Sequence, residues 1–439
     1  MTDSTFAAVV MAGGLGTRMN SSVPKHLHPI LGRRMVDWVL EAARPLAPSP
    51  LVVVASPDSR DAFDDVPVAV QERPLGTGDA VRSARDAVDG AGSLLVLSGD
   101  APLLTSDLLA RLLETHRHER AAATVLTFEP AEPGAYGRVL RGDDGAVAAI
   151  VEAADATPQQ LEVRECNSSI YVFETERLWP AVDALRPHNA QGELYLTDVV
   201  RDLVGRGDRV AAHAAVDPRE TAGVNTRAEL AAAAAALRDR MNLGHMLAGV
   251  TIVDPATTWI DPTVELEPDC TIHPFTVLRG STHIEAHAEV GPHAVAIDAR
   301  VGAGATVGPF CYLRPGTVLG AGSKAGTFVE LKKALIGAGT KVPHLSYIGD
   351  AEIGEGTNIG AGTITANFPH RAGEEKGKTT IGDNVRVGVD TVFVAPVTVG
   401  DDAWTAAGAV VTDDVPANAL AGFPPKQVNK EGRGGKRND

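Results

Sequence analysis

The sequence predicts two fold classes in one chain: a Rossmann-like α/β domain with a mostly parallel sheet and, after a linking helix, a left-handed parallel β-helix. Two observations carry this prediction. Residues 1–227 alternate short apolar runs with segments of helical periodicity, as in a parallel sheet covered by helices. From about residue 248 the pattern changes to a repeat of six residues, which is typical of a β-helix.

The apolar runs of the first half read as buried strands. Between them, residues 76–88 and 105–120 have the spacing of helices, and either Thr105 or Ser106 is placed to cap the second of these helices. The expected strands are 6–10, 51–56, 93–100, 122–129 and 168–174.

An alanine-rich segment, residues 226–242, separates the two halves. Alanine has the highest intrinsic helix propensity, so we expect a single helix that links two domains; a core helix of the first domain is the alternative. The expected domains are 1–227 for the α/β fold, 228–247 for the linker helix, 248–422 for the β-helix and 423–439 for a flexible basic tail.

Aliphatic residues recur every six positions in the second half, with occasional steps of five, and a glycine usually follows. In a β-helix such residues point inward and stack between coils, while small residues fit the corners. A β-helix also has open ends and flat faces, so we expect oligomerisation. The repeat positions are Val301, Val307, Leu313, Leu319, Ala325, Leu331, Ile336, Val342, Ile348, Ile353, Ile359, Ile381, Val387, Phe393 and Val399.

The bulk properties exclude several classes of protein. The chain has 439 residues and a formal net charge of −16 at pH 7, so its surface repels nucleic acids and anionic membranes. The three cysteines lie far apart without metal-ligand spacing, which favours a reducing compartment. Neither a signal peptide nor an apolar run of about 20 residues is recognisable. We therefore expect a cytoplasmic protein without membrane insertion.

A glycine-rich segment, "MAGGLGTRM" at 11–19, directly follows the first expected strand. It lacks the Gly-Lys-Ser/Thr of a Walker A loop and the third glycine of the dinucleotide-binding fingerprint. Its glycines allow the backbone to approach an anion closely, and Arg18 and Lys25 supply cations. The segment therefore indicates a phosphate-binding loop, with a tight structural turn as the alternative.

Further loops of the first half also carry glycine or polar residues at their centre. "SGDAPL" places Asp100 at the end of an expected strand, where open α/β sheets bind ligands. Loops with a central Gly, Glu or Asn occur in "ERPLGTGDA", "AYGRV", "VEAAD", "CNSS" and "AGVNT". With these motifs the chain resembles the nucleotide-sugar pyrophosphorylases. With the β-helix attached, it closely resembles, from about residue 6 to 422, the bacterial bifunctional N-acetylglucosamine-1-phosphate uridyltransferases / glucosamine-1-phosphate acetyltransferases.

The resemblance implies roles for residues of the first half. The phosphates of UTP would lie on Ala12, Gly13, Gly14 and Gly16, with Arg18 and Lys25 as catalytic cations. Gln71, Gly76 and Thr77 would read the uracil, and Gly137, Glu152 and Asn167 would bind the sugar. Asp100 and Asn225 would hold Mg²⁺, and Asn225 would also contact the nucleotide sugar. Such phosphoryl transfer depends on positioning and charge neutralisation rather than on a protein nucleophile.

In the β-helix, polar residues interrupt the aliphatic repeat. The resemblance makes His344 the general base that deprotonates the amine of glucosamine 1-phosphate as it attacks acetyl-CoA, a task that suits a neutral imidazole near pH 7. Relatives build each such site from neighbouring chains, which implies a homotrimer. The implied sugar-phosphate ligands are Arg314, Glu330, Lys332, Tyr347, Asn358, Asn367 and Lys376, and the implied acetyl-CoA contacts are Ala361, Val389 and Ala407.

One loop departs from the family pattern. The usual Asn-Tyr-Asp-Gly reads "NFPHRAGEEKGKT" at 367–379, with Phe368 in place of the tyrosine. Lys376 or Lys378 can supply the family's loop lysine, and the K-x-K-T context favours Lys376. Val389 stands where many members have serine, and Phe423 where some have arginine against the coenzyme.

The histidines of "HLH" at 26–28 and "HRH" at 116–118 have no third ligand at a useful spacing. We interpret them as solvated residues of a helix or a loop rather than as metal ligands.

Three functional hypotheses follow. In the first, the enzyme acetylates glucosamine 1-phosphate and then transfers UMP to the product, making UDP-N-acetylglucosamine for cell-wall precursors. In the second, the uridyltransferase stands on a β-helix that only trimerises or has altered acyl transfer. In the third, the nucleotidyltransferase acts on another sugar 1-phosphate.

Overall fold

The structure, a computed structural model, describes residues 5–14, 16–187, 189, 191–368, 373, 375–422 and 427–430. The chain divides into two compact units, Met1–Ala236 and Leu237–Asp439. Of the expected basic tail, residues 423–426 and 431–439 lie outside the described residues, and so do Pro369 and His370 of the rebuilt loop.

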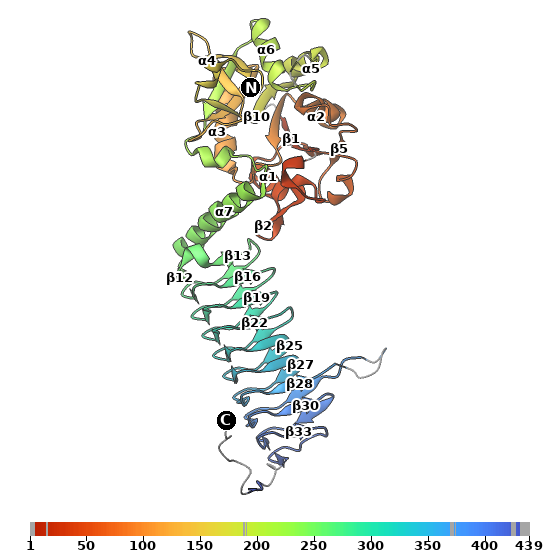
Figure 1. The fold of residues 1–439 in the computed structure, drawn as a ribbon, viewed down its shortest axis with the longest axis vertical. Coiled ribbons are helices and arrows are strands. Elements are labelled where there is room, and N and C mark those ends of the chain that lie inside the picture. The colour runs from red at the N-terminus through yellow and green to blue at the C-terminus, as the bar shows by residue number, and fades with distance from the viewer. Residues whose placement is uncertain are drawn as a thin grey trace, which may run out of the picture. The chain divides into compact units, whose positions relative to one another are not determined.

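The first unit is built around a nine-stranded sheet (Figure 1) with the order β11-β7-β10-β6-β1-β4-β5, to which β8 and β9 are attached. Its centre is parallel, because β1 pairs in parallel with both β4 and β6, whereas β10 runs antiparallel to β6 and β7. The predicted mostly parallel sheet is confirmed. The strands are β1 (Phe6–Ala12), β4 (Leu51–Ala55), β5 (Val68–Val70), β6 (Ser93–Ser98), β7 (Ala123–Phe128), β8 (Arg138–Arg141), β9 (Val147–Val151), β10 (Cys166–Glu174) and β11 (Val210–Ala214).

Helices cover both faces of this sheet. Alternate residues of β1 point to opposite sides, so Val9 packs in one apolar cluster and Val10 in the other. The first cluster contains residues of α2, α5 and α6, and the second contains residues of α1 and α3. Thr105 is the N-cap of α3 and accepts a hydrogen bond from the backbone N–H of Leu108 at 3.2 Å. The helices are α1 (Met35–Ala43), α2 (Thr77–Ser83), α3 (Ser106–Glu119), α4 (Pro158–Leu161), α5 (Thr175–Ala184) and α6 (Thr197–Gly205).

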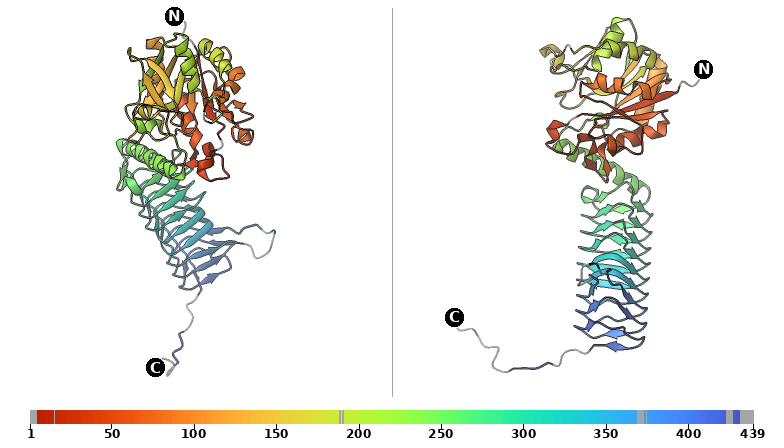
Figure 2. Two further views of the ribbon diagram at one scale, coloured as in Figure 1. Left: turned by 45° about the horizontal axis from the view of Figure 1, so that its top comes forward. Right: turned by 90° about the vertical axis from the view of Figure 1, so that its right-hand side faces the viewer.

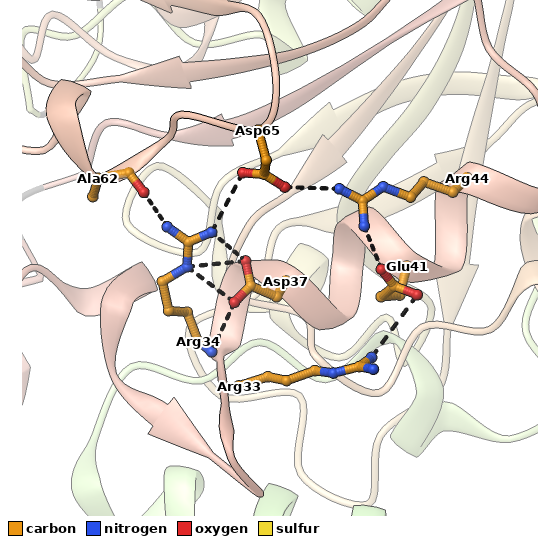
Figure 3. A network of polar contacts seen from close by, with 7 residues as sticks. All are labelled: Arg33, Arg34, Asp37, Glu41, Arg44, Ala62 and Asp65. Carbon is orange, nitrogen blue, oxygen red and sulfur yellow. Dashed lines mark hydrogen bonds and ion pairs between the residues drawn. The ribbon is translucent and has the colours of Figure 1, made fainter. Parts of the chain in front are cut away.

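A network of charges fastens α1 to the segment that follows β4 (Figure 3). Arg34 Nη2 lies 2.7 Å from Asp37 Oδ1 and 3.7 Å from Asp65 Oδ1. Arg44 lies 2.9 Å from the other oxygen of Asp65 and also pairs with Glu41. Because these side chains are partly exposed, each pair adds little stability, but together they fix one flank of the sheet whose edge carries the cavity described below. Arg33 and the carbonyl of Ala62 complete the network.

The alanine-rich segment forms the helix α7 (Arg227–Leu247). The helix ends just before Gly249, which has a φ of +97° and therefore breaks the helical path. The predicted helix is confirmed, and its last turn extends beyond the alanine-rich stretch.

The second unit is a stack of coils in which every strand pair is parallel (Figure 2). Leu313, Leu331 and Ile348 lie in register on consecutive coils and are fully buried. All the repeat positions predicted from the sequence belong to one buried cluster. The predicted parallel β-helix is confirmed.

The strands of the β-helix fall on three faces. The first face carries β12 (Thr251–Ile252), β15 (Thr271–Ile272), β18 (Glu289–Val290), β21 (Thr306–Val307), β24 (Lys324–Thr327), β26 (Lys341–His344), β32 (Trp404–Thr405) and β34 (Leu420–Ala421). The second carries β13 (Trp259–Ile260), β16 (Val277–Arg279), β19 (Val295–Ile297), β22 (Tyr312–Leu313), β28 (Ile364–Ala366), β30 (Val392–Val394) and β33 (Val410–Val411). The third carries β14 (Glu265–Leu266), β17 (His283–Ile284), β20 (Arg300–Val301), β23 (Val318–Leu319), β29 (Thr379–Ile381) and β31 (Val397–Val399). Two long strands, β25 (Glu330–Ile336) and β27 (Tyr347–Ile353), pair with strands of both the second and the third face.

The three cysteines, Cys166, Cys270 and Cys311, are buried free thiols. Within the described part of the chain, none of the helices has the length and apolar character that crossing a membrane requires.

Candidate active sites

A cavity of about 510 Å³ opens in the first unit where β1 and β6 end. This is the sheet edge at which open α/β folds bind ligands. The cavity is lined by most of the residues predicted to bind the nucleotide: Gly13, Gly14, Gly16, Arg18, Lys25, Gln71, Gly76, Thr77 and Asp100. Ala12 lies beside them as the buried last residue of β1.

The Lys25 ammonium lies between two oxygen atoms in this cavity. It forms a short ion pair with Asp100 Oδ2 and donates a hydrogen bond to Asn225 Oδ1 at 3.1 Å. Arg18 donates to the same Asn225 oxygen at 2.9 Å, and Ser98 donates to Asp100 Oδ1 at 2.6 Å. Arg18 and Asn225, 207 positions apart in the sequence, therefore meet at one point together with Lys25 and Asp100.

The electrostatics of Asp100 favour its ionised form. Burial opposes ionisation, but the Lys25 charge and the hydrogen bonds from Lys25 and Ser98 hold the pKa of Asp100 below its ordinary value. Asp100 and Asn225 thus present one carboxylate oxygen and one amide oxygen to a single cation position. Among the described residues, no group of three or more His, Cys, Asp and Glu side chains comes together as a metal site. The donor pair nevertheless fits a hydrated Mg²⁺, which takes few protein ligands and completes its shell with water and phosphate oxygens.

The glycine loop needs glycine where it approaches Lys25. Gly16 has a φ of +60°, and a Cβ there would lie 2.5 Å from Lys25 Cβ. Gly13 faces Gln71, whose Oε1 would lie 2.9 Å from a Cβ at that position. A side chain at either position would displace Lys25 or Gln71, two residues that are predicted to bind the nucleotide. Glycine at these positions leaves room for both.

The predicted uracil-binding residues, Gln71, Gly76 and Thr77, also line this cavity. Gln71 Nε2 donates to the carbonyl of Gly76 and to Asp79 Oδ2, both at 3.1 Å. Gly76 has a φ of +115° and lies against the backbone of Leu194. These bonds orient the Gln71 amide before any ligand arrives.

A second cavity, of about 270 Å³, adjoins the first, since Met11, Thr77 and Glu193 line both. Glu152 lines it, and Thr197 Oγ1 donates to Glu152 Oε1 at 3.1 Å. Burial raises the pKa of Glu152 above its ordinary value. The cavity is therefore a polar pocket next to the nucleotide-sized one.

The other two predicted sugar residues support this pocket rather than line it. Asn167 is buried and donates from Nδ2 to the Tyr171 hydroxyl at 2.7 Å, and Tyr171 lines the cavity. Gly137 lies against Glu152, whose Oε2 would be 3.3 Å from a Cβ there.

Sequence reasoning missed three further residues that line the second cavity: Tyr171, Tyr195 and Thr197. Tyr171 sits inside an apolar strand, which conceals it. Tyr195 and Thr197 belong to "LYLTD", in which hydroxyl-bearing and apolar residues alternate without a glycine. This alternation at the start of α6 is the sequence signal that could have identified Tyr195 and Thr197 as cavity residues.

The expectation of solvated histidines is wrong for three of the four. His26 and His28 are buried beside the glycine loop, and His116 is buried under β7 and β10. Burial lowers the pKa of His26 to about 4, so its imidazole is neutral near pH 7. The packing of the loop against the strand ends explains this burial, because His26 fills the space between Gly14 and Gly99. His118 is exposed, as expected.

In the second unit, four of the seven predicted sugar-phosphate ligands lie on or directly after β22, β25 and β27: Arg314, Glu330, Lys332 and Tyr347. Asn358 lies elsewhere, between Lys341 and Arg386 on the first face. Tyr312 pairs with Glu330, and Glu330 pairs with Tyr347 on the next coil. Arg314 follows Tyr312 by two positions, and Lys332 follows Glu330 by two positions. Arg314 and Lys332 therefore occupy equivalent places on consecutive coils. Arg314 Nη1 donates to Glu330 Oε1 at 2.8 Å. Two cations and a tyrosine thus gather on one face of the β-helix.

His344 lies in a column that includes all three predicted acetyl-CoA contacts. Backbone bridges join equivalent residues of four successive coils: Lys341, Asn358, Arg386 and Trp404. His344, Ala361, Val389 and Ala407 each lie three positions further along the chain and so occupy equivalent places. His344 is exposed, and the coils that follow it carry two alanines and a valine in line with it.

The rebuilt loop is fixed at both ends. Asn367 is buried and donates to Asp350, and its carbonyl accepts a hydrogen bond from Gly377 N–H at 3.1 Å. Lys378 Nζ lies 2.5 Å from Glu352 Oε1. Lys376 instead lies close enough to Lys332 to lower the pKa of that ammonium. Of the two candidate loop lysines, only Lys376 is next to another predicted ligand.

The α/β fold and its cavity define a nucleotidyltransferase. The profile of the MobA-like NTP transferase domain family matches residues 8–195. The chain is also similar to proteins named bifunctional protein GlmU. That of Mycolicibacterium paratuberculosis is 50% identical over 97% of this chain and 92% of the relative. The protein of Streptomyces coelicolor is 49% identical over 97% of this chain and 93% of the relative. The protein of Mycobacterium tuberculosis is 48% identical over 97% of this chain and 91% of the relative. The chain belongs to the GlmU family, which confirms the resemblance seen in the sequence and, with it, a bifunctional uridyltransferase and acetyltransferase.

Proposed function

We propose that the chain makes UDP-N-acetylglucosamine in two steps, with acetyl transfer in 248–422 preceding uridylyl transfer in 1–227 and α7 joining the two domains. The first step takes acetyl-CoA and glucosamine 1-phosphate. The second joins the product, N-acetylglucosamine 1-phosphate, to UMP from UTP. The final product would supply cell-wall precursors in the cytoplasm.

In the uridyltransferase domain, a phosphate oxygen of N-acetylglucosamine 1-phosphate attacks the α-phosphorus of UTP, and pyrophosphate leaves. The observation that supports this most directly is the cation position between Asp100 and Asn225. These two residues would hold Mg²⁺, which neutralises phosphate charge when bound. Lys25 and Arg18 would then be released toward the UTP phosphates, which the backbone of residues 12–14 and of Gly16 would receive.

The two adjoining cavities suit the two parts of the product. Gln71, Gly76 and Thr77 would contact the uracil in the larger cavity. Glu152 would contact the sugar in the smaller one, with Gly137 and Asn167 behind it. Transfer of this kind needs reactants held in line and their charges balanced, which this arrangement supplies.

In the acetyltransferase domain, His344 would take a proton from the amine of glucosamine 1-phosphate. The amine nitrogen then attacks the thioester carbonyl carbon, a C–N bond forms, the C–S bond breaks, and CoA leaves. Arg314, Lys332 and Lys376 would bind the phosphate, and the column of Ala361, Val389 and Ala407 would receive acetyl-CoA. Glu330, Tyr347, Asn358 and Asn367 would surround the sugar.

The proposed homotrimer is supported by an exposed row of stacked rings on the β-helix. Adjacent ring centroids lie 4.7, 4.8 and 5.2 Å apart, and the phenylalanines remain about half exposed. Apolar surface of this extent favours burial against another chain. The row consists of Phe275, His293, Phe310 and Phe328.

The test is CoA release by the purified full chain from acetyl-CoA and glucosamine 1-phosphate, with His344→Ala as the variant. Pyrophosphate release from UTP, Mg²⁺ and N-acetylglucosamine 1-phosphate by the same samples reports on the other domain. We expect both activities in the wild type and loss of CoA release alone in the variant. Pyrophosphate release without CoA release in the wild type would contradict the acetyl-transfer proposal and leave a uridyltransferase on a β-helix scaffold.

A further inference from the structure

Phe368 and Lys376 face each other across the neck of the rebuilt loop. The backbone hydrogen bond from Gly377 N–H to the Asn367 carbonyl closes this neck at 3.1 Å. Asn367 is itself buried and bonded to Asp350. The next residues outward on the two sides are Phe368 and Lys376, so the anchored neck brings them together.

The Lys376 ammonium lies between an aromatic ring and another cation. Its Nζ is 5.6 Å from the centroid of the Phe368 ring and close enough to Lys332 to affect the pKa of that ammonium. Lys376 lowers the pKa of Lys332, and the charge of Arg314 adds to the effect. Two ammonium groups repel each other, so some other contact must hold Lys376 in this place. The charge of Asp350 favours the Lys332 ammonium. The face of an aromatic ring attracts a cation, and among the described residues the Phe368 ring is placed to do this for Lys376.

The Phe368 side chain lies at the surface of the β-helix. It is 75% exposed, so it does not serve the apolar core. The family pattern has a tyrosine at position 368. In this chain the phenylalanine keeps the aromatic ring but lacks the hydroxyl. The ring face is therefore the feature that the neighbouring lysine can use.

We propose that Phe368 is a positioning residue of the acetyltransferase site, whose ring holds the Lys376 ammonium beside Lys332 and Arg314 to form a three-cation site for the phosphate of an amino-sugar phosphate. The inference rests on the proposed function of this domain. It assigns Phe368 no contact with the reacting atoms.

The test measures the equilibrium binding of glucosamine 1-phosphate to the full chain by calorimetry, and then KM and kcat for CoA release. Because an exposed cation–π contact is weak, we expect Phe368→Ala to weaken binding and raise KM about threefold, with kcat nearly unchanged. Phe368→Tyr restores the ring and should match the wild type. Phe368→Leu keeps the apolar bulk without the ring face and should behave like the alanine variant.

A double variant separates positioning from general loop damage. If Phe368 acts through Lys376, the Phe368→Ala change should add nothing to Lys376→Ala. Additive effects, full rescue by leucine, or wild-type binding by Phe368→Ala would each overturn the inference, and so would a wild type that fails to bind glucosamine 1-phosphate. Binding with these expected differences but without CoA release would support the three-cation site and contradict only the proposed acetyl transfer.

Discussion

Lys25 and Asp100 form an ion pair at the end of the central strands, with only 11% and 14% of their side chains exposed. Such a pair is costly to break on one side, because the remaining buried charge loses its partner. The proposed Mg²⁺ ligand therefore already holds a cation, and a metal ion entering this position would free Lys25 for the phosphates.

Asp100→Asn should abolish most uridylyl transfer. The substitution removes the negative charge that both Lys25 and the metal need, so we expect pyrophosphate release to fall on the order of 100-fold. CoA release by the same sample should not change, because those ligands lie in the other unit. Asp107→Asn, at the exposed start of α3, is the matched control and should keep both activities. Asp100→Asn retaining more than about a tenth of the wild-type rate would contradict the assignment.

The two loop lysines should behave differently. Lys378 pairs with Glu352, and both side chains are about half exposed, so the pair contributes little. Lys376→Ala should raise KM for glucosamine 1-phosphate about tenfold, since it removes one charge-assisted contact to phosphate. Lys378→Ala should change KM less than about twofold. The reverse order in steady-state CoA release would show that Lys378 is the ligand.

Much of the fold could be predicted because its signals are local. The repeat of Val301, Val307 and Leu313 reports the inward face of each coil directly, so both the β-helix and its core follow from spacing. The glycine loop and Asp100 could be placed together because both follow expected strands, and parallel strands end at one edge.

The rest depends on contacts between distant residues. Nothing near His26 in the sequence reveals that it packs between Gly14 and Gly99. Likewise, the choice between Lys376 and Lys378 depends on Glu352, which lies on the preceding coil. Spacing identifies an element, but it does not show which side chains the folded chain brings together.

Gly244→Ala should stabilise the protein. Gly244 lies inside α7 and is exposed, its φ is not positive, and a Cβ would meet nothing within 4 Å. Alanine reduces the freedom of the unfolded chain, so the free energy of unfolding should rise by about 0.5–1 kcal/mol. Urea unfolding followed by circular dichroism measures this change. The contrasting variant is Gly249→Ala just after the helix, where φ is +97° and Pro268 is 3.3 Å from the new Cβ; it should destabilise. Equal effects of the two variants would contradict this explanation.

A pair formed by a buried histidine and a partly exposed carboxylate predicts how acid acts on the first unit. His116 is 3% exposed and Glu174 44% exposed, and His116 Nε2 lies 2.9 Å from Glu174 Oε1. The hydrogen bond from His116, opposed by burial, holds the pKa of Glu174 below its ordinary value. The unfolded state therefore binds a proton on Glu174 more readily than the folded state does. The stability that this carboxylate contributes is present above the ordinary pKa of a glutamate, 4.5, and is lost as pH falls through the folded pKa.

Because Glu174 is 44% exposed, solvent screens the pair, and Glu174→Gln should cost less than about 1 kcal/mol of unfolding free energy near pH 7. The difference from the wild type should shrink as pH falls below about 4.5. Urea unfolding followed by the helical circular dichroism band, repeated from pH 7 to pH 3.5, measures this convergence. Glu129→Gln, at an exposed position just after β7, is the control and should match the wild type throughout. A Glu174→Gln deficit that stays constant over this range would mean that the ionised carboxylate is not what His116 stabilises.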